Sequence, residues 1–314
     1  MSHEDIMAAA RRIAPFIRRT PVVKLDHATG ADLQNDVYLK LECLQVSGSF
    51  KIRGATNRVK TLEPSRIENG LVAASGGNHG LATAYVAAQA GVPATIYLPN
   101  NASPLKAEKL RKWGADVRFA GNVWDEAHEA ASAKAKACGA FYMHPFADAQ
   151  IVSGQGTVAL EMVDQIPDAD IYIVAIGGGG LISGMSEVLK HVKPDARIIG
   201  VEPTGSPTLH ASLAAGHVVR LPEITTKVAT MACGRTDESI YAIVAKHVDD
   251  IVLVEDADMQ KAAELLWFEF GIAADLSGAA SLAALMSGAF KPPRGARIAG
   301  LVCGAGVEGL NGRG

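Results

Sequence analysis

The chain has 314 residues, 48% of them hydrophobic and 20% charged, and a formal net charge of -3 at pH 7. This length accommodates two lobes or one large α/β unit, and the composition is that of a soluble globular protein. The slightly acidic balance argues against a nucleic-acid or anionic-membrane partner, and no apolar run is long enough to span a bilayer. Four scattered cysteines without a CxxC pair, and a start without a secretory signal pattern, lead us to expect a reduced, cytoplasmic protein.

Short apolar segments alternate with longer alanine-rich segments along the chain, which predicts an α/β fold with a largely parallel sheet. Strands are predicted at 37–41, 70–74, 94–98, 116–119, 171–175, 198–201, 250–254 and 298–302, and helices from 51, over 81–90 and 104–113, and after 180. Several of these strands run into a glycine-rich turn at their C-terminal end. Open α/β sheets bind their ligands at that edge.

Lys51 opens the first of these helices, directly after Gly48, Ser49 and Phe50. A lysine among small and aromatic residues suits an amine that is partly desolvated and held near a carbonyl, so that it forms a Schiff base. A single lysine is far more often an exposed surface residue. Lys51 is therefore a candidate only in combination with the turns that follow it.

The clearest anion site is a run of four glycines between a predicted strand and a predicted helix. These are Gly177, Gly178, Gly179 and Gly180. Converging backbone N–H groups and the helix N-terminus favour a phosphate there, although a flexible turn would have the same composition. The spacing is not GxGxxG, no Lys-Ser/Thr follows, and Glu202 before Pro203 is a poor ribose ligand, so a nicotinamide cofactor is disfavoured.

A second turn of this kind follows the predicted strand at 70–74. It contains Ser75, Gly76, Gly77, Asn78, His79 and Gly80. Its amides and the Ser75 hydroxyl suit a carboxylate, and the Asn78 amide suits a ring oxygen. The same residues would also make a plain helix cap, and a histidine such as His79 is most often structural.

Cys303 ends the last predicted strand, directly before Gly304. A lone buried thiol is usually part of the packing. The glycine beside it leaves room for a ligand, and the spacing does not decide between the two interpretations.

Together these segments resemble the fold-type II pyridoxal-phosphate enzymes (tryptophan synthase β-like), specifically the serine/threonine dehydratase and serine racemase group. Six motifs carry the resemblance in order: Ser47 to Ala55, Ser75 to Gly80, Ser153 to Thr157, Gly177 to Gly180, Val201 to Pro203, and Ser277 to Ala279. The resemblance implies an α/β protein of two domains, each with a mostly parallel sheet flanked by helices. The large cofactor-binding domain would comprise residues 1–45 and 149–314, and the small mobile domain residues 46–148.

The resemblance also implies roles for individual residues. Lys51 would form the Schiff base with pyridoxal 5'-phosphate, Phe50 would pack on the ring, and Asn78 would bond the ring 3-oxygen. The phosphate would be bound by Gly177, Gly178, Gly179, Gly180 and Leu181, and Cys303 would face the pyridine nitrogen. The substrate would be bound by Ser75, Gly76, Gly77, Asn78, His79 and Gln155.

Two departures from this group bear on its chemistry. Racemases of the group carry a second serine after the first in the small-domain turn, as acid or base on the opposite face, and here that position is Gly76. Glycine has no proton to give, which weakens a two-base racemisation and leaves a one-base elimination intact. Some members bind a divalent cation through a glutamate before proline and an aspartate six residues on. Glu202 fits, but Thr208 stands in place of the aspartate, so we expect no metal site and keep Glu202 as the single candidate ligand.

Further departures lie on the substrate side. The group's Glu-Pro-Ser-Gly-Ala is Asp275-Leu276-Ser277-Gly278-Ala279 here, and its Ser-Gly-Gly-Asn is Cys303-Gly304-Ala305-Gly306. The stretch 229–234 bears a faint likeness to ammonia-lyases that act on diamino acids. The cofactor chemistry is unaffected, while the substrate side chain stays open.

The sequence thus predicts β-elimination from a β-hydroxy-α-amino acid of the threonine, serine or 3-hydroxyaspartate type, giving a 2-oxo acid and ammonia. Lys51, displaced from the cofactor by the substrate amine, would remove the α-proton with the cofactor as electron sink. The alternatives are amino-acid racemisation, β-replacement, elimination from a diamino or bulkier substrate, and a non-catalytic cofactor carrier or amino-acid sensor. The expected partners are the amino acid and a second copy of the chain in a homodimer.

Overall fold

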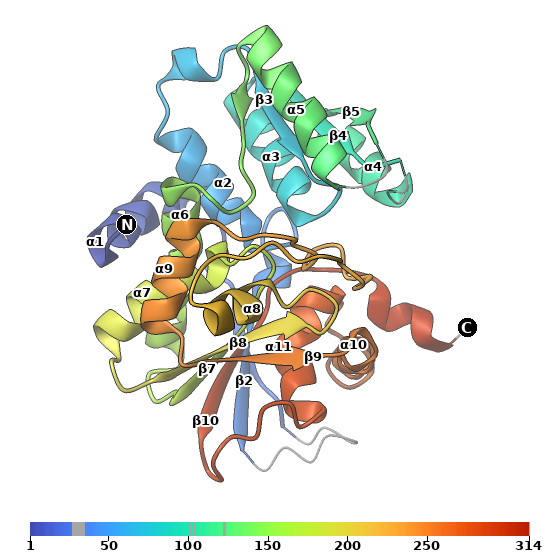
Figure 1. Ribbon diagram of the computed structural model, residues 1–314. Coiled ribbons are helices and arrows are strands. Elements are labelled where there is room, and N and C mark those ends of the chain that lie inside the picture. Colours follow the sequence, from blue (N-terminus) through green and yellow to red (C-terminus); the bar gives the residue numbers. More distant parts are fainter. Residues whose placement is uncertain (27–34, 101, 103, 122–123, 314) are drawn as a thin grey trace.

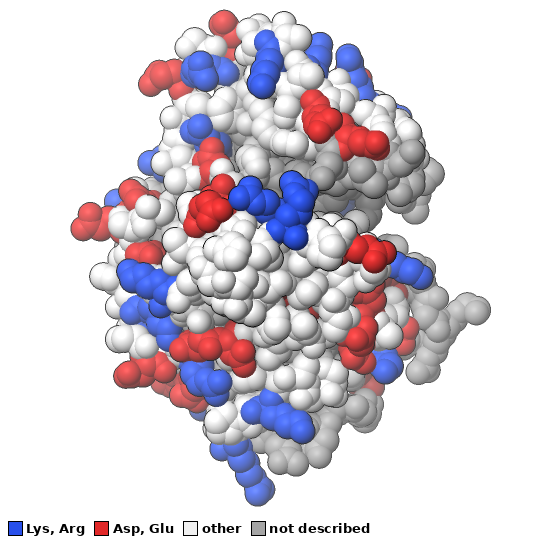
Figure 2. Space-filling view, viewed as in Figure 1, with Lys and Arg blue, Asp and Glu red and all other residues white. Residues whose placement is uncertain are grey.

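The computed structural model describes residues 1–26, 35–100, 102, 104–121 and 124–313. Two lobes are stacked one above the other, each built on its own sheet, with the N-terminal helix beside their junction (Figure 1). The fold class is α/β with two sheets dominated by parallel pairs, as predicted. Acidic and basic side chains are interspersed over the visible face, without a large block of one sign (Figure 2).

The large lobe contains a six-stranded sheet in the order β1-β2-β10-β7-β8-β9. Its strands are β1 (Val22–Lys24), β2 (Asp36–Leu41), β7 (Ile171–Ala175), β8 (Arg197–Pro203), β9 (Asp250–Val254) and β10 (Arg297–Val302). The edge strand β1 is antiparallel to β2, and all other pairs are parallel. The chain leaves β7 and β10 at the same edge of the sheet, so the glycine run and Cys303 lie at that edge.

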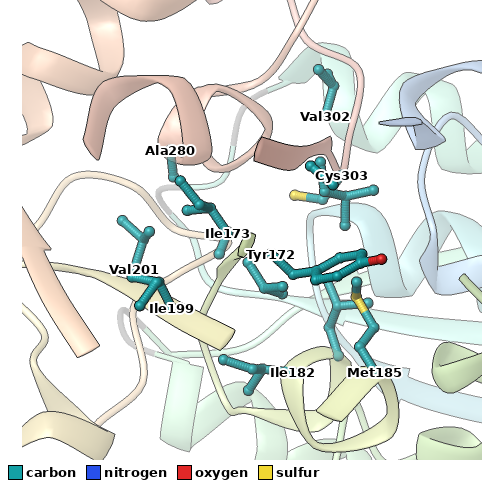
Figure 3. Packing of buried hydrophobic residues seen from close by; sticks show 14 of the residues in the cluster. Tyr172, Ile173, Ile182, Met185, Ile199, Val201, Ala280, Val302 and Cys303 are labelled. Atoms are coloured by element: carbon teal, nitrogen blue, oxygen red, sulfur yellow. The ribbon is translucent and has the colours of Figure 1, made fainter. Parts of the chain in front are cut away.

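Helices cover both faces of this sheet, as parallel sheets require. They are α1 (His3–Ile13), α6 (Ala149–Gln165), α7 (Gly180–Val192), α8 (Thr208–Ala215), α9 (Glu238–His247), α10 (Asp256–Phe270) and α11 (Leu276–Met286), with 3-10 turns η1 (Ala14–Phe16), η2 (Glu42–Leu44) and η4 (Glu308–Arg313). In the core, Ile173 of β7 lies between Ala280 of α11 and Ile182 of α7 (Figure 3). Every residue of β7 is buried, and each large apolar side chain contributes about 1.5–3 kcal/mol.

The small lobe contains a parallel four-stranded sheet in the order β5-β4-β3-β6. Its elements are β3 (Leu71–Ala74), β4 (Ala94–Leu98), β5 (Asp116–Phe119), β6 (Phe141–Tyr142), α3 (Asn78–Ala90), α4 (Pro104–Lys112), α5 (Trp124–Cys138) and the turn η3 (Pro64–Arg66). Along β3, Leu71 and Ala73 join one apolar cluster with α3, while Val72 and Ala74 join another with α5. This alternation follows from the two-residue period of a strand.

The helix α2 (Lys51–Lys60) connects the lobes and packs against α6. The contact is close because a Cβ on Gly154 would lie 2.5 Å from the Cα of Gly54. In the first turn of α2, the buried Arg53 forms ion pairs of 2.7 Å with Glu42 and 2.8 Å with Glu161. Because removing one partner of a buried ion pair costs about 3–5 kcal/mol, this network fixes the start of α2 on the large lobe.

The fold prediction is confirmed, and the predicted strands agree with observed ones to within about one residue at most ends. The short strands β1 and β6 were not predicted from the sequence. The strands of the small sheet all fall within residues 46–148, and those of the large sheet fall outside that range. The mobility of the small domain stays a prediction. No described helix is long and apolar enough to cross a membrane.

Candidate active site

Lys51 lies where the two lobes meet, at the first residue of α2. Its Nζ donates a 2.8 Å hydrogen bond to the backbone oxygen of Pro145 and lies 5.2 Å from the centroid of the Phe50 ring. The surrounding protein desolvates the amine and lowers the pKa of Lys51 to about 8. A substantial fraction of the amine is therefore neutral near physiological pH, as a nucleophile or base requires.

Phe50 connects this lysine to the end of β10. Its backbone N–H donates a 3.1 Å hydrogen bond to the oxygen of Cys303, and its side chain is buried. Ala305 then donates to the oxygen of Gly48 over 2.8 Å. These bonds bring Phe50, and with it the neighbouring Lys51, close to Cys303, which lies roughly 250 residues later in the chain.

The four glycines form a tight loop at the N-terminus of α7, which no side chain caps among the described residues. Gly179 has φ of +90°, and a Cβ on it would lie 2.5 Å from Ile240. A Cβ on Gly178 would overlap the ring of Phe146 at 2.2 Å, and the Thr236 hydroxyl donates to the oxygen of Gly178 over 3.1 Å. Glycine is thus required at this loop, whose uncapped N–H groups suit an anion.

The small-domain turn joins β3 to α3 and faces the large lobe. The Ser75 hydroxyl accepts a 3.3 Å hydrogen bond from the N–H of Gly77, and both residues are half-buried. A Cβ on Gly77 would lie 3.2 Å from the Thr230 methyl group of the large lobe, and one on Gly76 would lie 3.2 Å from Leu98. Thr230 also approaches the other loop, since its oxygen lies 2.8 Å from the position of a Cβ on Gly177. The two glycine turns therefore face each other across one short segment.

Asn78 bonds across the junction to a residue whose role was not predicted from the sequence. Its Nδ2 donates a 2.8 Å hydrogen bond to Oδ2 of Asp275, which is 6% exposed. The other oxygen of Asp275 accepts from the Ser277 hydroxyl and the N–H of Gly278. This carboxylate fixes the orientation of the Asn78 amide. The only sequence signal was that aspartate replaces the group's glutamate.

Cys303 is buried, and its Sγ donates to the hydroxyl of Ser277 over 3.5 Å. Burial raises the pKa of the Cys303 thiol well above its usual range, so the thiol stays neutral. In Figure 3 it lies beside the core side chains at the end of β10. A neutral thiol beside a hydroxyl provides no fixed negative charge at the pyridine position implied by the resemblance.

Two residues predicted to bind substrate make supporting contacts instead of facing open space. His79 is buried, and its Nε2 bonds with the oxygen of Met143 over 2.9 Å. Desolvation lowers the pKa of His79 to about 3, so the ring is neutral and Nε2 is the donor. Gln155 of α6 accepts a 3.2 Å hydrogen bond from the N–H of Gly54 and so supports α2.

The segment between β6 and α6 completes the site, and it was not predicted from the sequence. Pro145 holds the Lys51 amine, and Phe146 covers Gly178 and Gly180. The Nδ1 of His144 accepts from the N–H of Ala147 over 2.8 Å, and burial lowers the pKa of His144 to about 4. The segment has no helix or strand pattern, so only its place between two elements would have identified it.

Glu202 at the end of β8 does not resemble a cation ligand. Its two oxygens accept hydrogen bonds of 2.9 Å from the N–H groups of Leu209 and His210. Burial raises the pKa of Glu202 to about 7, although these donors and Thr208 act in the opposite direction. In the part of the chain that the structure describes, no group of three His, Cys, Asp or Glu residues could hold a metal.

Comparison with known proteins identifies the family. Residues 13–304 match the family described as Pyridoxal-phosphate dependent enzyme. The chain is 36% identical to an L-threonine ammonia-lyase of Thermotoga maritima, over 97% of this chain and 75% of that protein. It is also 36% identical to a serine racemase of Arabidopsis thaliana, over 91% of this chain and 86% of that protein. The chain belongs to the pyridoxal-phosphate-dependent enzymes and has their fold-type II architecture.

Solved structures agree with this assignment. Maize serine racemase superposes with a TM-score of 0.91 at 33% identity, over 98% of this chain and 94% of that one. The serine racemase of Dictyostelium discoideum superposes with a TM-score of 0.86 at 27% identity, over 98% of each chain. Both are similar over almost the full length of the chain.

The residues at the junction fit pyridoxal 5'-phosphate. The loop from Gly177 to Gly180 is a cradle that any Cβ would obstruct, and it precedes an uncapped helix N-terminus that suits a phosphate. The Lys51 amine, with its lowered pKa, suits a covalent bond to the cofactor aldehyde. The aromatic ring of Phe50 lies beside this amine and has an apolar face that would suit the cofactor ring.

Proposed function

We propose that this protein is an ammonia-lyase that removes the β-substituent of a β-hydroxy-α-amino acid and yields a 2-oxo acid and ammonia. One observation carries the proposal. Lys51 supplies an amine whose pKa is lowered to about 8, whereas Gly76 in the facing turn has no side chain that could act as a second acid or base. One base at Cα is sufficient for elimination, but a racemase of the two-base type needs two.

Pyridoxal phosphate, when bound, accepts the electron pair left by the α-proton. Residues of the protein remove the proton and bind the substrate. Lys51 takes the proton from Cα, and the Pro145 oxygen fixes its Nζ by a 2.8 Å hydrogen bond. The turn at Ser75 to Asn78 offers a hydroxyl, backbone N–H groups and an amide to the substrate carboxylate and the ring oxygen. These roles in substrate and cofactor binding are part of the proposal.

The relatives support the same reaction class. Proteins named L-threonine ammonia-lyase from Thermotoga maritima and Geobacter sulfurreducens are each 36% identical to this chain. Their names are the reason for preferring threonine as a first substrate, and the serine racemases among the relatives are the reason for adding serine. The β-hydroxyl of such a substrate is the leaving group, and it would depart as water, with the proton that Lys51 takes from Cα balancing the one that the hydroxyl gains.

Racemisation is the second candidate, because serine racemases are among the relatives and the similar structures. Gly76 argues against it as the main reaction. A racemase would need another proton donor on the face opposite Lys51, and Gly76, which stands where the racemases carry a serine, supplies none.

The test is an ammonia-release panel over β-substituted amino acids: serine, threonine, 3-hydroxyaspartate and 2,3-diaminopropionate, with and without a divalent cation. We expect stoichiometric ammonia and 2-oxo acid from at least one hydroxy-amino acid, without a need for cation. No ammonia from any member, together with cofactor spectra that respond to amino acids, would favour the carrier or sensor alternative.

We further propose a small mobile domain, residues 46–148, that closes over the substrate, and a cytoplasmic homodimer. Exposed apolar side chains on α10 and beside it support a second copy as partner; they are Trp267, Phe268, Val307 and Leu310. None of the four cysteines, all of which lie within the described residues, forms a disulfide, which agrees with a reducing compartment. Sedimentation of the holoenzyme tests the dimer, which a monomeric mass at micromolar concentration would exclude.

A further inference from the structure

The carboxylate of Glu202 accepts hydrogen bonds from two backbone N–H groups of α8, a helix that lies later in the chain. Glu202 is 0% exposed at the end of β8, and each of its oxygens accepts one N–H of the first turn of α8. The residue before α8 is Pro207, whose side chain has no acceptor, and no other side chain caps α8 among the described residues. Glu202 therefore caps helix α8 from a neighbouring strand, through both oxygens of its side chain.

The start of α8 is also hydrogen-bonded to a later segment of the chain, at Cys233. The hydroxyls of Ser206 and Thr208 both donate to the oxygen of Cys233, and the N–H of Cys233 donates to the Ser206 hydroxyl over 3.0 Å. Both hydroxyl-bearing residues are buried. Both polar backbone groups of Cys233 are thereby fixed to the start of α8.

This arrangement reaches the glycine loop by two routes. The Thr236 hydroxyl, three residues after Cys233, donates to the oxygen of Gly178 over 3.1 Å. Leu209, whose N–H bonds to Glu202, lies with its Cδ1 2.8 Å from the position of a Cβ on Gly179. A shift of α8 would therefore move side chains that contact Gly178 and Gly179 of the glycine loop.

We propose that Glu202 is a positioning residue for the phosphate-binding loop, acting through α8, and that cofactor binding in this chain is independent of divalent cations. Both carboxylate oxygens of Glu202 accept hydrogen bonds from backbone N–H groups. Thr208 stands where a second cation ligand would be expected, and its hydroxyl donates to the backbone oxygen of Cys233. A cation at this place would meet N–H donors instead of free oxygens. The inference rests on the phosphate cofactor of the proposed function and does not depend on the reaction.

The experiment compares two ligands of apoenzyme from which the cofactor has been removed. Pyridoxal 5'-phosphate and pyridoxal share the ring and aldehyde, so the ratio of their dissociation constants isolates the phosphate contribution. We measure it by absorbance titration for wild type, Glu202→Gln and Glu202→Ala, each with EDTA or with millimolar Mg²⁺. Glu223→Gln, an exposed glutamate in the same half of the chain, is the matched charge control.

In the expected result, both Glu202 variants bind pyridoxal 5'-phosphate about ten-fold more weakly, the size of one lost charged hydrogen bond. Pyridoxal affinity and the control stay at the wild-type value, and EDTA and Mg²⁺ change nothing. If the variants bound pyridoxal and pyridoxal 5'-phosphate more weakly by the same factor, Glu202 would contribute only to the stability of the fold, and the proposal would be overturned. A ten-fold gain in cofactor affinity with Mg²⁺ would also overturn it. If Glu202→Ala does not fold, Glu202→Gln, which keeps the size of the side chain, decides the matter alone.

These outcomes are separable from the proposed reaction. Both dissociation constants are measured without turnover, so a wild type that binds cofactor and releases no ammonia contradicts the lyase and leaves the role of Glu202 intact. Conversely, active ammonia release with an unchanged phosphate contribution in the variants contradicts only the role of Glu202.

Discussion

The two glycine turns of the site differ in how firmly the rest of the protein holds them. The large-lobe loop at Gly177 to Gly180 is enclosed by Ile240, Leu209 and Phe146, and a Cβ at any position in it would meet a neighbour at 3.0 Å or less. At the start of the small-lobe turn, Gly76 and Gly77 are half-buried, and a Cβ on either would meet its nearest neighbour only at 3.2 Å, whereas a Cβ on the buried Gly80 in α3 would overlap the oxygen of Ser75. The loop for which we propose phosphate binding is therefore more tightly enclosed than Gly76 and Gly77, for which we propose substrate binding. This difference suits one cofactor and a range of substrates in related enzymes.

Lys51, the proposed base, lies at the start of α2 where the two lobes meet, so its loss should have the largest effect. We expect Lys51→Ala to reduce kcat by about 1,000-fold or more, because a general base of this kind contributes up to ~10,000-fold. The variant should also lose the covalent cofactor, visible as a changed absorbance spectrum. Lys60→Ala, at the exposed end of the same helix, is the control and should behave like wild type. Retained turnover in Lys51→Ala would contradict the proposed mechanism.

A matched pair of substitutions tests the contrast between the turns directly. Gly179→Ala forces a Cβ within 2.5 Å of Ile240 at φ of +90°, so we expect cofactor affinity to fall about 100-fold. Gly77→Ala meets the Thr230 methyl group at 3.2 Å, so it should mainly raise KM for the amino acid, about ten-fold. Cofactor titration and steady-state kinetics separate the two effects. An equal loss of cofactor affinity in both variants would remove the distinction.

The pH dependence of cofactor attachment is the next largest effect. A Lys amine titrates near 10.5 in water, whereas desolvation lowers the pKa of Lys51 to about 8. The neutral amine is the nucleophile, so the rate of covalent attachment to apoenzyme should rise through pH 8 and level off above about pH 9. Stopped-flow absorbance measures this rate, with Nα-acetyl-lysine in solution as the reference. A rate that still rises through pH 10 would show that the amine is not desolvated.

Of these substitutions, Gly76→Ser should change the rate of elimination least. Its specific effect should be to introduce racemisation. The added Cβ would lie 3.2 Å from Leu98 and 3.7 Å from Ala102, which requires a shift of a few tenths of an ångström. We expect lyase activity within about three-fold of wild type and a new, small rate of racemisation. Chiral chromatography of recovered serine detects it. Unchanged chirality in a fully active variant would show that the hydroxyl does not reach the substrate.

The sequence predicted most of the fold because the central strands carry continuous apolar runs that end in glycine turns. It also selected Lys51, Phe50 and Cys303, which lie close together in the structure, while their roles toward the cofactor stay a prediction. It could not predict the segment at Pro145 and Phe146, which lacks a periodic pattern and acts through a backbone oxygen and packing. The hydrogen-bond partners of Asn78 and Glu202 could not be predicted either, because both bonds join residues that only the tertiary fold brings into contact.

The central claim is that Lys51 is the only acid or base at Cα, so that elimination prevails over racemisation. The direct test follows pyruvate, ammonia and D-serine in one reaction of the holoenzyme with L-serine. We expect equal amounts of pyruvate and ammonia and less than about one D-serine per hundred turnovers. D-serine formed at a rate comparable to pyruvate would contradict the claim, because a second proton donor would then face the substrate opposite Lys51.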